Sequence, residues 1–126
     1  MSINEHAPDS ANLDPVIAPY LREREQILVR RSNARLTPVS PGQQPSPPVS
    51  GPLFLTDRRL MNLEGKLHSI ELADITELAI SGDKVLVTLR GSHGAILELD
   101  SPDEFRSSIA AAISASRTRY LKRPSR

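Results

Sequence analysis

The segment at residues 53–63 constrains the fold of this chain more than any other. It has the sequence Leu-Phe-Leu-Thr-Asp-Arg-Arg-Leu-Met-Asn-Leu, in which two short apolar runs flank a polar centre at residues 56–59. This pattern is typical of two strands joined by a tight turn. We therefore predict a β-hairpin within a domain built mainly from β-strands.

Short strand patterns separated by turn residues continue on both sides of the hairpin. In the 84–90 segment Val85, Val87 and Leu89 lie on one face, which is the clearest alternation in the chain. Regular short strands with turns between them predict a sandwich or a small barrel. Outside the hairpin, we expect strands at residues 26–31, 36–39, 67–72, 75–80, 84–90 and 95–99.

One helix is expected after the last strand. Ser101 stands at the predicted N-cap, Pro102 at the first helical position, and Glu104 completes a capping box three residues after the serine. Apolar residues then recur at helical spacing, so one face of the helix is predicted to contact a core. We expect the helix to continue to about residue 119. The main apolar residues of this face are Phe105, Ile109 and Ile113.

Prolines are concentrated at residues 38–52. Because proline has no N–H to donate to a strand ladder, we expect a long loop here and no central strand. The loop is either a mobile insertion or a docking segment for a proline-recognition domain, since Pro45, Pro47 and Pro48 supply one P-x-x-P spacing.

The chain is predicted to contain one domain at residues 21–120. Residues 1–20 are expected to form a disordered or weakly ordered tail, with one helical turn starting near Asp14 and Pro15. Residues 121–126 are expected to form a basic C-terminal tail. No signal-peptide pattern opens the chain and no apolar run of membrane-spanning length occurs, so we expect a cytoplasmic protein.

The composition argues against several classes of function. The 16 basic and 15 acidic residues give a net charge of +1, and the few aromatic residues provide no stacking platform, so no nucleic-acid partner is expected. The absence of cysteine excludes thiol nucleophiles and cysteine zinc sites. The three histidines lack metal-ligand spacing, and no phosphate-binding glycine motif is present. We therefore expect no catalytic residue, no metal, no cofactor and no enzymatic activity.

A family resemblance narrows the predicted fold. Residues 51–60 resemble the "G-x-L-x-L-T-D-x-R-L" hairpin of GRAM and bacterial PH-like domains, which belong to the pleckstrin-homology superfold. Residues 70–75 are similar to the following "I-x-L-x-D-I" step, and residues 21–29, with Glu25, to the opening "L-x-x-x-E-x-I-L" strand. The resemblance implies a mainly β fold, a bent sandwich or barrel of about seven antiparallel strands capped by the C-terminal helix. Phe105, Ile109 and Ile113 would then plug its open end.

Two groups of polar residues are candidates for a role in the hairpin or in binding. Thr56 and Asp57 are expected to bond backbone amides of the hairpin turn, which is a structural role. Arg58 and Arg59 would project from the hairpin end toward an anionic ligand, because the planar guanidinium group matches phosphate geometry. The remaining candidates for anionic-ligand or membrane contact are Arg30 and Arg31, which are adjacent and point to opposite faces in a strand.

The sequence thus favours a non-enzymatic binding module with an unknown protein partner. Contact is expected through an exposed strand edge, the Pro-rich loop or the hairpin end. The alternative is a weak electrostatic association with anionic membrane lipids through the four arginines and the basic tail. A homodimer is a third possibility, because a domain of this size gains little stability from its own core.

Overall fold

The computed structural model describes residues 17–44, 47–64 and 66–121 of the 126-residue chain. The predicted tail at residues 1–20 therefore lies mostly outside the described residues, as does the basic tail at residues 121–126. Ile17 is fully buried, so ordered structure begins before the predicted domain boundary at residue 21. The helical turn expected near Asp14 and Pro15 lies outside the described residues, within which the first helical segment is the 3-10 helix η1 (Ala18–Tyr20).

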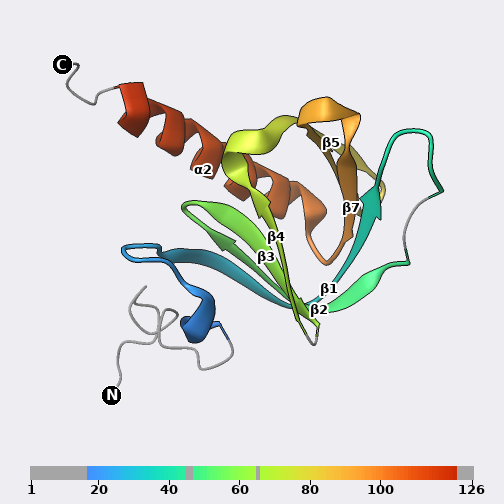
Figure 1. Ribbon diagram of the computed structural model, residues 1–126, viewed down its shortest axis with the longest axis horizontal. Helices are drawn as coiled ribbons and strands as arrows, with labels where there is room; N and C mark the ends of the chain where they lie inside the picture. Colours follow the sequence, from blue (N-terminus) through green and yellow to red (C-terminus); the bar gives the residue numbers. More distant parts are fainter. Residues whose placement is uncertain (1–16, 45–46, 65, 122–126) are drawn as a thin grey trace.

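Seven antiparallel strands and one long helix make up the fold (Figure 1). The hydrogen-bonded order of the strands is β4-β3-β2-β1-β7-β6-β5. Figure 1 shows a strongly bent sheet with the helix α2 across one end. The predicted mainly β fold with a C-terminal helix is confirmed. The strands are β1 (Ile27–Val39), β2 (Val49–Thr56), β3 (Arg59–Glu64), β4 (Lys66–Glu71), β5 (Ile75–Ser81), β6 (Lys84–Leu89) and β7 (Gly94–Glu98), followed by α2 (Pro102–Leu121).

Strand β1 replaces the two early strands predicted at residues 26–31 and 36–39. Its register against β2 shifts between Arg31 and Ala34, where extra residues bulge out of the ladder. A bulge bends a strand without ending it. The second half of β1 then pairs with β7 as well, so that Leu36 lies opposite residues of both neighbours. One continuous strand thereby joins the two halves of the bent sheet.

The Pro-rich loop is shorter than predicted, because Pro38 belongs to β1 and Pro52 to β2. Strand β2 lies between β1 and β3, so the expectation that no central strand occurs at residues 38–52 is wrong. The ladder tolerates Pro52 because it lies beside the β1 bulge and beyond the last β2–β3 pair, Leu53 with Asn62. No ladder N–H is required at that position.

Asn62 compensates for the missing strand pairing at this point. Its side-chain Nδ2 donates hydrogen bonds to the carbonyl oxygens of Gly51 at 3.3 Å and Pro52 at 3.2 Å. Gly51 is required by close packing, since a Cβ atom at this residue would lie 2.1 Å from the carbonyl oxygen of Leu63. The start of the central strand β2 therefore depends on Gly51 within it and on the side chain of Asn62 from the neighbouring strand β3.

The apolar residues form two clusters, one on each face of β2 and β3. Leu53 and Leu55 belong to the larger cluster, whereas Phe54 between them belongs to the smaller one, as the two-residue period of a strand requires. The smaller cluster consists of Phe54, Met61, Ile27 and Ile17, so the segment before β1 covers the outer face of the hairpin. The larger cluster includes Leu60, Val85, Val87, Leu97, Phe105 and Ile109.

Helix α2 contributes its apolar face to the larger cluster. Phe105 and Ile109 are fully buried there, and Ile113 packs against the same residues. The predicted capping box is wrong: Ser101 has a left-handed φ of 53°, whereas an N-cap residue is extended. Glu104 instead lies with a carboxylate oxygen 3.6 Å from Nη2 of Arg31. No helix in the described ranges is long and apolar enough to span a membrane.

Candidate functional site

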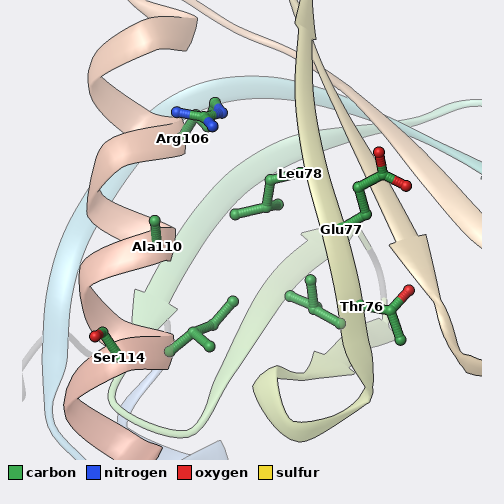
Figure 2. A pocket seen from close by; sticks show the side chains of 8 residues that line it. Thr76, Glu77, Leu78, Arg106, Ala110 and Ser114 are labelled. Atoms are coloured by element: carbon green, nitrogen blue, oxygen red, sulfur yellow. The ribbon is translucent and has the colours of Figure 1, made fainter.

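A groove of about 330 Å³ runs between strand β5 and helix α2 (Figure 2). Arg106, Ala110 and Ser114 recur every four residues along α2 and therefore share one face of the helix. Figure 2 shows Leu78 pointing from β5 into the space beside the helix, whereas Glu77 points to the other side of the strand. The groove is lined by Ile75, Thr76, Glu77, Leu78, Arg106, Ala110, Ile113 and Ser114.

Strand β5 is an edge strand, since β6 is its only neighbour in the sheet formed by the described residues. Ser81 lies opposite Lys84 across a two-residue turn, and such a turn makes the flanking pair a hydrogen-bonded one. Hydrogen-bonded and non-bonded pairs alternate along an antiparallel ladder, so Ala79 also faces β6. The backbone N–H and C=O groups of Leu78 and Ile80 consequently face the open edge.

This edge has the properties of a docking surface. Unpaired backbone groups on an edge strand are a template for a further strand, and natural proteins usually block them with charge, proline or a covering segment. Strand β5 contains no proline and a single charged residue, Glu77, and Ile80 is one of the large apolar residues that remain exposed, at 36%. The groove beside it would receive the side chains of an added strand.

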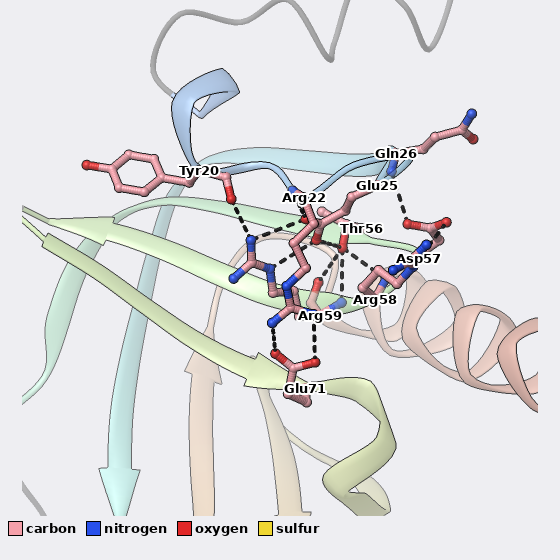
Figure 3. Close-up of polar contacts among 9 residues, drawn as sticks. All are labelled: Tyr20, Arg22, Glu25, Gln26, Thr56, Asp57, Arg58, Arg59 and Glu71. Carbon is pink, nitrogen blue, oxygen red and sulfur yellow. Dashed lines mark hydrogen bonds and ion pairs between the residues drawn. The ribbon is translucent and has the colours of Figure 1, made fainter.

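The candidate residues of the hairpin lie in a different place, at a buried ion pair (Figure 3). Glu25 and Arg59 are 2% and 6% exposed. The Arg59 guanidinium donates from Nε to Oε2 of Glu25 at 3.0 Å and from Nη2 to Oε1 at 3.2 Å. Nη2 also donates to the carbonyl oxygen of Tyr20 at 2.6 Å. Arg59 therefore holds the segment before β1 against the hairpin.

Thr56 connects this ion pair to the hairpin turn. Its hydroxyl group donates to Oε2 of Glu25 at 2.6 Å and accepts hydrogen bonds from the amides of Arg58 and Arg59, both at 3.0 Å. Oδ1 of Asp57 accepts a hydrogen bond from the amide of Gln26, outside the turn, at 3.0 Å. The turn is thus stabilised by Thr56, and Asp57 links it to the start of β1.

Burial has the largest single effect on the pKa of Glu25 and would raise it. The hydrogen bonds from Arg59, from the Arg22 amide and from Thr56, together with the charge of Arg59, outweigh this effect and hold the pKa of Glu25 below its ordinary value. Arg22 also forms a two-point ion pair with Glu71 at the end of β4. The N-terminal segment is therefore attached to two strands by charge pairs.

The four arginines proposed for anion or membrane contact do not converge on one site. Arg59 points inward to Glu25, so its predicted projection toward a ligand is wrong. Arg30 and Arg31 lie on opposite faces of β1, as predicted, with their guanidinium groups 5.4 Å from the Phe54 ring centre and 5.5 Å from the Phe105 ring centre. Arg58 is more exposed than Arg59, and its Nε lies 4.0 Å from Oδ2 of Asp57.

The groove was not identified from the sequence, although one signal for it exists. Arg106, Ala110 and Ser114 lie next to the apolar stripe of the helix at a spacing of four, which places a second, more polar stripe beside it.

Glu25 entered the sequence interpretation only through the family resemblance, and its partner Arg59 lies in the hairpin, far along the chain. In the part of the chain that the structure describes, no three metal-ligating side chains gather.

No family model matches the sequence, and no curated protein matches it. Among solved structures, the chain is similar to the crystal structure of the C-terminal domain of an unknown protein from Leishmania infantum. The two are 18% identical, the match covers 79% of this chain and 89% of that chain, and the TM-score is 0.53. At this level of identity the similarity concerns the fold alone.

Proposed function

We propose that this protein is a PH-like, GRAM-type binding module without catalytic activity, and that it binds an extended segment of a partner protein beside β5. The observation that carries the proposal is the open edge of β5 next to a groove. In such β-augmentation the backbone hydrogen bonds supply affinity, and pockets for every second side chain supply specificity. The outward backbone groups of Leu78 and Ile80 would make these bonds.

The walls of the groove suit an added strand. Leu78 and Ile113 form an apolar part on which a partner side chain would pack. Ala110 and Ser114 are small, so the helix leaves room beside the strand. The other edge strand, β4, is less suitable, because Arg22 pairs with Glu71 at its end. The groove described above lies beside β5, against which α2 packs.

The membrane alternative has less support from the structure. Of its four arginines, Arg59 is buried in an ion pair and Arg31 pairs with Glu104. Arg30 is exposed, Arg58 is partly exposed and lies 4.0 Å from Asp57, and surface charges are screened at physiological salt. Weak membrane contact would not require the groove at all.

Selection from a random linear peptide library on the immobilised full chain tests the proposal. We expect enriched peptides whose affinity falls about tenfold or more in Ile80→Pro, because proline removes an outward backbone donor. Ile80→Ala is the matched control, since it shortens the same side chain but keeps the N–H group. Thermal unfolding of both variants verifies that they are folded.

Two results would contradict the proposed function. The library yields no peptide above background, or the Ile80→Pro and Ile80→Ala variants bind the selected peptides equally well. Light scattering on the same samples should give the mass of a monomer. A stable dimer whose contacts cover β5 would assign the edge to a second copy of the chain.

A further inference from the structure

We infer that the β5–α2 groove selects segments that carry an acidic side chain, and that Arg106 is the residue that recognises it. This inference rests on the proposed function and adds the chemical class of the partner. Arg106 lines the groove and is half-buried. Its side chain forms no ion pair and no hydrogen bond within the described part of the chain.

Arg106 differs in this respect from most arginines of the described ranges. A surface arginine without a counterion is common, but Arg106 lies in the wall of a groove. The other residues that line this groove are mostly apolar or small. Arg106 is only half-buried in this wall, so its guanidinium group stays accessible to a carboxylate of a bound segment. Arginine pairs elsewhere in the described ranges include Arg22–Glu71, Arg31–Glu104, Arg35–Glu98, Arg58–Asp57, Arg59–Glu25 and Arg90–Asp74.

Two acidic residues near the groove, Glu77 and Glu104, do not pair with Arg106. Glu77 contributes to the lining, but its side chain turns to the side of β5 away from the helix (Figure 2). Glu104, on the same helix, is paired with Arg31. A carboxylate brought by the partner would therefore meet an uncompensated cation, with two parallel hydrogen bonds from the planar guanidinium.

The geometry also predicts where the acidic residue lies in the partner. Arg106 and Ile113 are about 10 Å apart along the helix axis, at about 1.5 Å per residue. Alternate residues of a strand lie about 7 Å apart and share one face. A bound strand is thus expected to place an acidic side chain beside Arg106 and an apolar one beside Ile113, separated by two or four positions.

Binding of the selected peptides to variants of the full chain tests this inference. We expect the peptides to be enriched in Asp or Glu, and Arg106→Gln to lower their affinity about tenfold. Arg35→Gln, on an exposed arginine outside the groove, is the control and should leave the affinity unchanged. Arg106→Glu should reject the acidic peptides and bind versions in which the acid is replaced by lysine.

The outcomes separate this inference from the proposed function. Peptides that bind at β5 without enrichment of acids, and with equal affinity for the parent protein and Arg106→Gln, would overturn the role of Arg106 alone. Failure to select any peptide would overturn both. Affinity that depends on Arg106 and is restored by the charge exchange would support both.

Discussion

The two arginines of the hairpin turn differ in their contribution to stability. Replacement of Arg59 by leucine leaves the carboxylate of Glu25 buried without its guanidinium partner. We expect Arg59→Leu to lower the free energy of unfolding by about 3 to 5 kcal/mol, as measured by urea denaturation. The neighbouring Arg58→Leu should change it by less than about 0.5 kcal/mol, because that side chain is partly exposed.

A double variant distinguishes loss of an ion pair from loss of packing. Arg59→Leu combined with Glu25→Leu leaves no buried charge, so it should recover much of the stability lost in Arg59→Leu. Equal destabilisation by Arg58→Leu and Arg59→Leu, or a double variant less stable than either single one, would show that the buried pair does not have the assigned role.

The depressed pKa of Glu25 predicts a specific acid sensitivity. Its ordinary value is 4.5, and the folded value lies below this. As the pH falls below about 4.5 the unfolded chain takes up the proton first, so the stabilisation from this group is complete above that pH and is lost through the folded pKa. We expect the unfolding free energy of Glu25→Gln to fall less steeply with acid than that of the parent protein. Identical slopes below pH 4.5 would contradict this expectation.

The sequence predicted some of these residue roles and not others. Adjacent positions in a strand point to opposite faces, so the separation of Arg30 from Arg31 followed from local geometry alone. The burial of Arg59 depends on Glu25, and a pair so distant in sequence is set by the tertiary fold. Strand alternation therefore gave a correct prediction for Arg30 and Arg31, whereas the predicted outward projection of Arg59 was wrong because of its ion pair with Glu25.

At the scale of the elements, Gly51 controls how β2 leaves the Pro-rich loop. A Cβ atom there would lie 2.1 Å from the Leu63 carbonyl oxygen, so the strands would have to separate. We expect Gly51→Ala to destabilise the protein by about 1 to 3 kcal/mol. The control is Ser50→Ala on the same strand, where the side chain is exposed and the change should be small. A Gly51→Ala variant as stable as Ser50→Ala would show that this close approach does not occur.

The helix contributes to stability through its buried face. Phe105 is fully buried in the larger cluster, so Phe105→Ala is expected to cost about 3 to 5 kcal/mol, measured by chemical denaturation. Ser107→Ala on the exposed face of the same helix is the control and should have little effect. A small effect of Phe105→Ala would mean that α2 does not close the core.

The element boundaries show which local signals are reliable. The β5, β6 and β7 strands and α2 were predicted to within a residue or two, because alternation and helical spacing are strong there. Strand β1 was divided in two, because the polar residues of its bulge resemble a turn. The expectation of no central strand failed at Pro52, because this residue lies beside the β1 bulge, where no ladder N–H is required.

At the scale of the whole molecule, the strand order of the described residues leaves two edges, and α2 packs beside the β5 edge. The sequence predicted a mainly β domain with a helix at one end. An exposed strand edge was one of three predicted contact surfaces, beside the Pro-rich loop and the hairpin end. It did not identify which edge, because the groove combines residues of β5 with residues of α2 that are distant in sequence. Only the folded arrangement brings Leu78 and Arg106 to the same surface.

Residue-resolved amide hydrogen exchange, with and without a library-selected peptide, tests the central claim most directly. We predict that peptide binding slows exchange at Leu78 and Ile80 by about tenfold or more, because their outward N–H groups gain partners. The amide of Ala79, which faces β6, should change far less. Protection at the hairpin end or the Pro-rich loop, with Leu78 and Ile80 unaffected, would contradict binding at the β5 edge.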